Sequence, residues 1–398
     1  MAFINSNYLE LKENNFFLQV KSKVSQFTKE NPNKKLINLG MTDVTFPLAP
    51  SVTKAIHEAI IELTHEDDSV APVKAKNDDF LKEAIKSYYA KRDISLESNE
   101  IFISNGVKSD IANITDLFDD MNIVMITDPV FPFYRDNNIM SGKEVVYVNG
   151  NHFNKFLPMP LIDSTEADII YLSSPNNLTG TVYNHSQLRD WVEFALCSNA
   201  VILFDASYEA FITDDTLPRS IYEIEDARMC AIEFCNFSKS SSFMDAQCGY
   251  TIIPNELLGL DDDGYDISLN VLWNKRQATK HTNIPYIIQK ACAAALTEEG
   301  QKEVKATIAY YTHNANIITR TLKQKDIQFY GGVNSPYIWM KCPDGMTSWE
   351  YFDYLLENAA IVTMPGSEFG KYGEGYVRLM AYGEKEDIIE GMKRFMSV

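Results

Sequence analysis

The chain has 398 residues, 45% of them hydrophobic, which is enough for one large α/β domain with a smaller companion. Its net charge of −19 disfavours binding to nucleic acid or to an anionic membrane surface, and no apolar run approaches the length of a membrane-spanning helix. The N-terminus lacks a basic stretch followed by an apolar one, so we expect no signal peptide.

The cysteines and histidines are scattered along the chain. No C-x-x-C pair occurs, and no histidine lies near a cysteine at the spacing of zinc ligands. We therefore expect buried free thiols, a reducing cytoplasmic location and no metal site.

A helix is expected near residues 16–30, and seven short β-rich runs then follow. Several runs are apolar on both faces, which is typical of strands covered by helices. The runs are "IFIS" (101–104), "NIVMIT" (122–127), "EVVYV" (144–148), "DIIYLS" (168–173), "AVILFD" (200–205), "CAIEF" (230–234) and "GYTIIP" (249–254). Helix-length segments at 107–118 and 186–196 lie between the earlier runs, and Ser186 is the expected N-cap of the second.

This alternation predicts an α/β fold with a seven-stranded, mostly parallel sheet between helices. Because the last runs follow one another with little helix between them, we expect a mixed sheet with an antiparallel part. We assign residues 46–285 to this large domain.

The pattern changes in the C-terminal part of the chain. A long helix is expected at 301–325, a turn and strand at 329–343, a helix opened by the capping box of Thr347 and Glu350, a strand at 376–382 and a helix at 384–395. These elements predict a smaller α+β domain at 286–398, which the N-terminal segment 1–45 joins.

Polar residues collect at the predicted carboxyl ends of the strands, where open parallel sheets bind ligands. Gly106 permits a tight turn, and the helix after it begins with free N–H groups that suit an anion. The other strand ends carry Asn177 in "SPNNLTG", Asp205 followed by Tyr208, and Asn236, Ser238 and Lys239. An anion seat, a carboxylate, a phenol, an amide and a lysine together form a coherent site for pyridoxal phosphate.

Each residue type has a role in that chemistry. A lysine amine can bond to the cofactor aldehyde and later carry the substrate α-proton. A carboxylate keeps the pyridine nitrogen protonated, a phenol and an amide hydrogen-bond the ring oxygen, and an aromatic side chain covers the ring. An arginine can hold the substrate carboxylate through two parallel hydrogen bonds.

Several motifs resemble those of the fold-type I pyridoxal-phosphate-dependent aminotransferases, and within them the LL-diaminopimelate aminotransferase subgroup. The resemblance spans almost the whole chain and implies a homodimer with active sites at its interface, acting on an L-amino acid and a 2-oxo acid. The motifs are "LINLGMTDVTFPLAP" (36–50), "IFISNGVKSDI", "DPVFPFYRD" (128–136), "SSPNNLTGTV", "FDASYEAFITDDTLPRSIYEIEDAR" (204–228), "FSKSSSF", "GGVNSPYIWMK" and "GEGYVRLMAYGEKEDI" (373–388).

The resemblance implies a role for each matching residue. Lys239 would be the lysine that bonds to the cofactor, and Asp205 would be the partner of the pyridine nitrogen. Tyr208 and Asn177 would contact the ring oxygen, and Arg378 would bind the substrate α-carboxylate. The remaining implied contacts are Phe131 against the ring and Gly106, Val107 and Lys108 at the phosphate.

The chain departs from the family pattern around the phosphate and the substrate. Gln247 stands in place of a phosphate-binding arginine, Asn236 in place of a serine, Leu178 in place of a proline, and Thr42 where a glycine approaches the substrate.

The loop "SVAPVKAKNDD" (69–79) lacks both the tyrosine that reaches the neighbouring subunit's phosphate and the glutamate that contacts the distal end of diaminopimelate. A charge-assisted hydrogen bond to phosphate contributes about 1.5–3 kcal/mol, so cofactor binding should be weakened unless another cation compensates. Lys74 or Lys76 in this loop could supply one.

Three functions stay open. The leading one is a pyridoxal-phosphate-dependent aminotransferase. The altered loop at 69–79 and the polar "SSS" at 240–242 motivate a second, a lyase, racemase or oxidative enzyme of a biosynthetic pathway. The altered phosphate site motivates a third, a non-catalytic relative with impaired cofactor binding, although the retained polar set argues against it.

Overall fold

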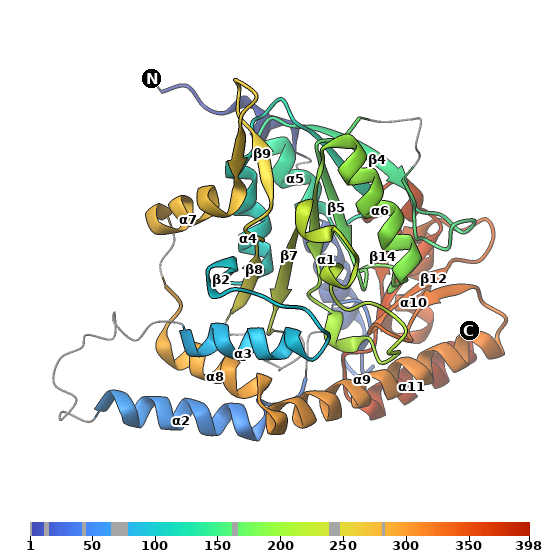
Figure 1. The fold of residues 1–398 in the computed structure, drawn as a ribbon. Helices are drawn as coiled ribbons and strands as arrows, with labels where there is room; N and C mark the ends of the chain where they lie inside the picture. The colour runs from blue at the N-terminus through green and yellow to red at the C-terminus, as the bar shows by residue number, and fades with distance from the viewer. Residues whose placement is uncertain are drawn as a thin grey trace.

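The computed structural model describes residues 2–11, 16–41, 45–64, 79–160, 166–238, 247–280 and 283–398. Its centre is a seven-stranded sheet ordered β2-β8-β7-β6-β5-β3-β4, in which β8 runs antiparallel to both of its neighbours (Figure 1). The strands are β2 (Ile101–Ser104), β3 (Ile123–Asp128), β4 (Glu144–Asn149), β5 (Ile169–Ser173), β6 (Val201–Asp205), β7 (Ala231–Asn236) and β8 (Gly249–Ile252). The predicted mixed sheet is therefore confirmed.

Helices cover both faces of this sheet because its strands are apolar on both faces. Ile202 and Phe204 of β6 face one helical layer, whereas Val201 and Leu203 face the other. The first layer contains α3 (Asp79–Ala90), α6 (His185–Ser198) and α8 (Tyr286–Leu296), and the second contains α4 (Val107–Ile114), α5 (Pro132–Met140) and α7 (Leu269–Lys280).

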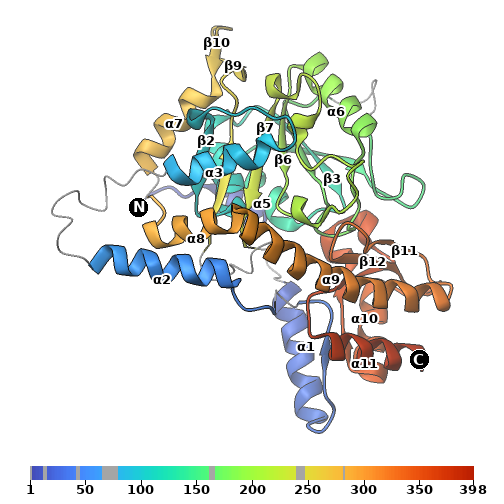
Figure 2. The same cartoon turned by 60° about the horizontal axis from the view of Figure 1, so that its bottom comes forward.

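Two outer features complete the large unit. Helix α2 (Pro50–Thr64) lies along α8, as Figure 2 shows, and the hairpin of β9 (Leu258–Leu260) and β10 (Asp266–Ser268) precedes α7. The N-cap of α6 is Asn184, whose side chain accepts a hydrogen bond from the backbone N–H of Gln187 at 2.9 Å. The expectation of Ser186 at that position is wrong, because the helix begins one residue before it.

A smaller unit is built on a four-stranded antiparallel sheet ordered β11-β12-β15-β14. Its strands are β11 (Phe329–Gly331), β12 (Tyr337–Lys341), β14 (Met364–Pro365) and β15 (Tyr376–Met380), and its helices are α1 (Phe16–Glu30), α9 (Glu298–Gln324), α10 (Ser348–Ala359) and α11 (Lys385–Met396). The N-terminal β1 (Ile37–Asn38) pairs in parallel with β13 (Ile361–Val362), which attaches the start of the chain to this unit. The predicted capping box of Thr347 and Glu350 opens α10.

Helix α9 connects the two units (Figure 2). Ala291 and Cys292 of α8 pack in the core of the large sheet, whereas Ala315 and Ile318 of α9 pack in the core of the small sheet. The domain limits 1–45, 46–285 and 286–398 stay a prediction, and this packing favours a change of unit within α9.

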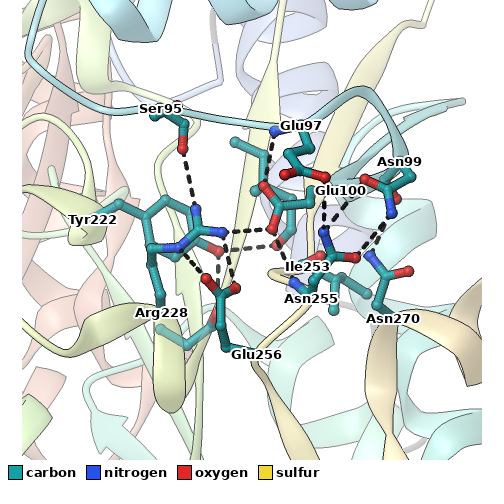
Figure 3. A network of polar contacts seen from close by, with 12 residues as sticks. Ser95, Glu97, Asn99, Glu100, Tyr222, Arg228, Ile253, Asn255, Glu256 and Asn270 are labelled. Atoms are coloured by element: carbon teal, nitrogen blue, oxygen red, sulfur yellow. Dashed lines mark hydrogen bonds and ion pairs between the residues drawn. The ribbon is translucent and has the colours of Figure 1, made fainter.

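A polar network joins β2, β7 and β8 at the amino edge of the parallel strands (Figure 3). The fully buried Glu100 accepts hydrogen bonds from Nη2 of Arg228 at 2.5 Å and from the backbone N–H of Asn255 at 2.9 Å. The Tyr222 hydroxyl lies within hydrogen-bonding distance of the carbonyl oxygens of Ala231 at 3.1 Å and Ile252 at 3.0 Å. These bonds fix the far end of the antiparallel strand β8.

All six cysteines are free thiols, and five of them are buried. Cys197 is exposed, so the expectation of buried thiols is wrong for this residue. In the part of the chain that the structure describes, no helix combines the length and the apolarity needed to cross a membrane.

Candidate active site

The carboxyl ends of β5, β6 and β7 bring the predicted polar residues to one edge of the sheet. Asp205 is the last residue of β6 and lies opposite Ser173 of β5 in the strand register. On the other side, Asn236 at the end of β7 lies opposite Gly249, and Gly249 lies opposite Ser104 at the end of β2. The residues that follow these strand ends therefore lie close together.

Asp205 is a buried carboxylate with three donors already in place. The Tyr134 hydroxyl donates to Oδ2, and Ser207 donates to Oδ1 through its backbone N–H at 2.9 Å and its hydroxyl at 2.5 Å. Burial raises the pKa of Asp205 in spite of these bonds. A cationic N–H partner would lower that pKa again, and the carboxylate oxygens retain lone pairs to accept it.

Tyr208 lies beside the small unit, within hydrogen-bonding distance of Tyr337. The two hydroxyl oxygens are 2.6 Å apart, and both side chains are buried. Burial raises the pKa of Tyr208 well above its usual value, so its phenol stays protonated and can donate one hydrogen bond.

Arg378 is a buried cation that has no carboxylate partner in the described part of the chain. Its side chain is 5% exposed, Nη1 donates to the carbonyl oxygen of Asn177 at 3.1 Å, and Nη2 lies 3.4 Å from the carbonyl oxygen of Gly40. Its Nε has no hydrogen-bond partner among the described residues. Burial lowers the pKa of Arg378 from its ordinary value, which is the effect expected of an unpaired charge. Such a guanidinium needs an anionic ligand.

The side-chain amide of Asn177 is half-buried and has no hydrogen-bond partner among the residues described. Its carbonyl oxygen anchors Arg378, so the "SPNN" turn contacts the small unit directly. This leaves the amide available to a ligand.

Phe131 is half-buried at the N-cap of α5, and Pro132 begins that helix. Its ring centroid lies 6.0 Å from that of Phe17 and 5.9 Å from that of Phe369. Phe131 therefore belongs to an aromatic cluster between the two units, and it lies three residues before Tyr134, which holds Asp205.

The turn at Gly106 has the geometry that the predicted anion seat requires. Gly106 has a φ of 103°, which favours glycine, and it is the N-cap of α4. The backbone N–H groups of Val107 and Lys108 follow it, and the side chain of Lys108 is exposed. A Cβ at Gly249 would lie 2.9 Å from Cα of Gly106 and 3.3 Å from the nitrogen of Val107. Glycine at 249 therefore lets the antiparallel strand approach the seat closely.

Asn236 is partly buried, and its Oδ1 accepts a hydrogen bond from the backbone N–H of Ser238 at 2.7 Å. Gln247 is exposed and precedes β8. Lys239 and Thr42 lie outside the described residues, as do Lys74 and Lys76. Ser238 and Gln247, on either side of the segment that contains Lys239, follow β7 and precede β8.

Three residues of the site were missed by the sequence analysis: Tyr134, Ser207 and Tyr337. Ser207 was the most accessible to prediction, because a hydroxyl two residues after a strand-end carboxylate commonly bonds back to it. Tyr134 lies one helical turn after Phe131, but only the fold brings it to Asp205. Tyr337 comes from the other unit, 129 residues from Tyr208, so no local pattern indicates their contact.

The described residues fit pyridoxal phosphate. Asp205 is a carboxylate for the ring nitrogen, Tyr208 and Asn177 offer hydrogen-bond donors, and the turn at Gly106 offers backbone N–H groups to a phosphate. The Nε of Arg378 has no hydrogen-bond partner among the described residues, so it can donate to a further anionic group.

Comparison with known proteins gives a consistent result. The profile of the family "aminotransferase class I and II" matches residues 34–395. An LL-diaminopimelate aminotransferase from Lawsonia intracellularis is 44% identical, and the alignment covers 99% of this chain and 98% of that protein. One from Parabacteroides distasonis is 42% identical with the same coverage.

Among solved structures, the L,L-diaminopimelate aminotransferase from Chlamydomonas reinhardtii superposes with a TM-score of 0.90 at 33% sequence identity. The match covers 100% of this chain and 98% of that one. The aspartate aminotransferase of Thermus thermophilus with maleate, at 19% identity and a TM-score of 0.82, shares the fold.

Proposed function

This chain belongs to the class I and II aminotransferases, the pyridoxal-phosphate-dependent enzymes that move an amino group between an amino acid and a 2-oxo acid, and we propose that LL-diaminopimelate is its amino donor. The two bacterial relatives and the algal enzyme are LL-diaminopimelate aminotransferases, which supports this donor.

The observation that carries the proposal is the unpaired, buried guanidinium of Arg378. A buried cation without an anion is costly, so its retention is best explained by a ligand that supplies the charge. In our proposal the α-carboxylate of the amino acid binds there in a bidentate manner, beside Asn177.

We assign the cofactor's ring to the space between Asp205, Tyr208 and Phe131. Asp205 would hold the ring nitrogen, while Tyr208 and Asn177 would donate to the ring oxygen. The phosphate would lie at the backbone N–H groups after Gly106, with Asn236 and Gln247 near it. When bound, the cofactor supplies an electron sink for the electrons released at the substrate α-carbon.

Lys239 would bond to the cofactor and then, as a free amine, move the proton at the substrate α-carbon. Its amine must be neutral for that step, which a nearby cationic ring and a desolvated cleft favour. Thr42 would approach the substrate, and Lys74 or Lys76 of a second subunit would replace the missing phosphate-binding cation.

We further propose that the protein is a homodimer in the cytoplasm. Exposed apolar side chains on the N-terminal segment and on α2 support an interface there: Phe3, Ile4, Leu9, Ile60 and Ile61. The free thiols support a reducing compartment. Analytical ultracentrifugation should give twice the mass of the chain, and Ile61→Asp should reduce it; a wild-type monomer at micromolar concentration would contradict the dimer.

The amino donor can be tested with the purified protein and added pyridoxal phosphate. LL-diaminopimelate should convert the absorbance of the bound cofactor to that of its amine form, and a panel of 2-oxo acids should restore it. Lys239→Ala should abolish both changes, and the DD isomer is the matched control substrate.

The outcomes of this spectroscopic test distinguish the possible amino donors and reaction types. A cofactor spectrum that changes with another L-amino acid but not with LL-diaminopimelate would reject the donor and keep the reaction. Turnover of an amino acid without formation of the amine form would favour a lyase or racemase.

A further inference from the structure

Tyr337 connects the residues that we assign to the cofactor and to the substrate. It is the first residue of β12 and is buried, and its hydroxyl oxygen lies 2.6 Å from that of Tyr208. Its ring lies 5.1 Å from the guanidinium carbon of Arg378. One side chain therefore touches both Tyr208 and Arg378.

The direction of the Tyr208–Tyr337 hydrogen bond decides what Tyr208 can do. A phenol has one hydrogen, so Tyr208 cannot donate to Tyr337 and to the cofactor at the same time. The guanidinium over the ring of Tyr337 draws electron density from that ring and makes its hydroxyl the stronger donor. This favours Tyr337 as the donor and Tyr208 as the acceptor, a direction that the geometry of the bond allows.

We propose that Tyr337 is a positioning residue that donates to Tyr208 and thereby directs the Tyr208 hydrogen toward the ring oxygen of pyridoxal phosphate. This inference rests on the proposed function. The hydrogen bond that Tyr208 receives strengthens the one that it donates, because consecutive hydrogen bonds polarise each other. Tyr337 acts through Tyr208 and touches neither the cofactor nor the substrate.

The proposal has a spectroscopic consequence. A donor at the ring oxygen competes with a proton on the adjoining lysine nitrogen for the same oxygen electrons. Removing the Tyr337 hydroxyl weakens that donor, so the nitrogen keeps its proton to higher pH. In Tyr337→Phe the pH midpoint of the absorbance change of the bound cofactor should rise by about half a unit.

Tyr330→Phe is the matched control. Tyr330 lies on β11, next to β12, and its hydroxyl accepts a hydrogen bond from Gln328 at 2.7 Å, so this variant also loses one bonded hydroxyl. Its midpoint should equal that of the wild type. Tyr208→Phe should raise the midpoint, and adding Tyr337→Phe to it should cause no further rise, because the effect passes through Tyr208.

The results distinguish this inference from the proposed function. A wild-type protein without a cofactor band would reject both. A normal wild-type band with an unchanged midpoint in Tyr337→Phe would reject the role of Tyr337 alone. An equal rise in Tyr330→Phe, or a full additional rise in the double variant, would also overturn it.

Discussion

Arg378 shows, at the scale of one residue, how the site differs from the rest of the molecule. Arg276 is also largely buried, but its Nε donates to Asp116 at 2.8 Å and its Nη2 donates to Asn113 at 2.7 Å. Among the described residues, Arg378 donates only to two carbonyl oxygens and the Met380 sulfur, and two aromatic rings lie near it, Tyr337 and Phe369. One arginine is therefore paired with a carboxylate, whereas Arg378 has no carboxylate partner among the described residues, as our proposal for the substrate requires.

Arg378→Met should separate activity from stability. The substitution removes an unpaired buried charge, so the free energy of unfolding should change by less than about 1 kcal/mol. It also removes the bidentate partner of the substrate carboxylate, so kcat/KM should fall by about 100-fold. Urea denaturation and steady-state kinetics measure the two effects.

Arg276→Met is the control, and it should show the opposite pattern. It removes the hydrogen bonds that Arg276 donates to Asp116 and Asn113, although Lys280 still pairs with Asp116 at 2.9 Å, so stability should fall by about 1–3 kcal/mol while KM is unchanged. A large loss of stability in Arg378→Met, with proportional loss of activity, would mean that Arg378 is structural.

At the scale of one element, β8 is fixed at both ends by different means. At the amino edge of the sheet, the network around Glu100 holds it to β2 and β7 (Figure 3). At the carboxyl edge, Gly249 allows it to approach Gly106 and Val107. The Glu100 network should determine the stability of the fold, and the close approach at Gly249 should determine the affinity for the cofactor phosphate.

Gly249→Ala should weaken cofactor binding. The new Cβ would lie 2.6 Å from the carbonyl oxygen of Cys235 and 2.9 Å from Cα of Gly106, so the backbone of the seat must move. We expect a dissociation constant for pyridoxal phosphate at least about tenfold higher and a stability loss of about 1–3 kcal/mol. Gly259→Ala, whose Cβ would meet only the side chain of Leu269 at 3.2 Å, should bind normally. Absorbance titration measures the affinity for pyridoxal phosphate. Equal affinities of the wild type, Gly249→Ala and Gly259→Ala would argue against phosphate binding at the Gly106 turn.

Glu100→Gln should destabilise the fold without affecting the cofactor. The buried carboxylate accepts from Arg228, and its loss should lower the free energy of unfolding by about 1–3 kcal/mol. Glu256 pairs with the same guanidinium at 2.9 Å but is exposed, so Glu256→Gln should cost less than about 1 kcal/mol. If urea denaturation shows equal losses, burial is not what makes the Glu100 bond strong.

At the scale of the whole molecule, two of the carboxyl groups buried in the large unit of this strongly acidic chain have strongly raised pKa values. Glu233 of β7 accepts from Tyr89 at 2.5 Å and Ser220 at 2.7 Å, and Asp110 of α4 accepts from Ser104 at 2.5 Å and Thr251 at 2.7 Å. Burial raises the pKa of each to about 7. Neither has a cation hydrogen-bonded to it in the described part of the chain.

The stability of the protein should therefore fall as the pH rises from about 4 to 7. A raised pKa means that the folded state holds a proton that the unfolded state has already lost. The stabilisation from this proton is therefore complete below the pKa of the unfolded state, and it is lost as the pH rises to the pKa of the folded state. Each carboxyl contributes a slope of about −1.4 kcal/mol per pH unit in that interval. Exposed carboxylates with lowered pKa values act in the opposite direction, but only weakly because water screens them.

Glu233→Gln tests the assignment of this slope. Glutamine is neutral at all pH values and nearly isosteric, so the decline in unfolding free energy between about pH 4 and 7 should be clearly less steep. Glu83→Gln, at an exposed ion pair with Lys86, should leave the slope unchanged. A stability that rises over this interval in the wild type would refute the buried carboxyls as its main source.

The sequence was sufficient for the sheet and for the residues that follow its strands. Each of the seven strands of the large sheet, β2 to β8, lies within a residue or two of its predicted run, because apolar faces and turn residues are local signals. The contact of Tyr208 with Tyr337 depends on how β12 packs against the large unit, and no periodicity encodes that. Likewise, "VRL" indicates a strand but not that Arg378 lacks a carboxylate, which depends on every neighbour in three dimensions.

The reversed direction of β8 has a consequence for the segment that contains Lys239. A parallel strand in that place would have required a crossover to the opposite edge of the sheet. Instead the chain leaves β7 and enters β8 at the same edge of the sheet, where Asn236 lies opposite Gly249. If Lys239 bonds to the cofactor, as we propose, adding residues between 239 and 246 should alter the position of its amine while the sheet itself stays intact.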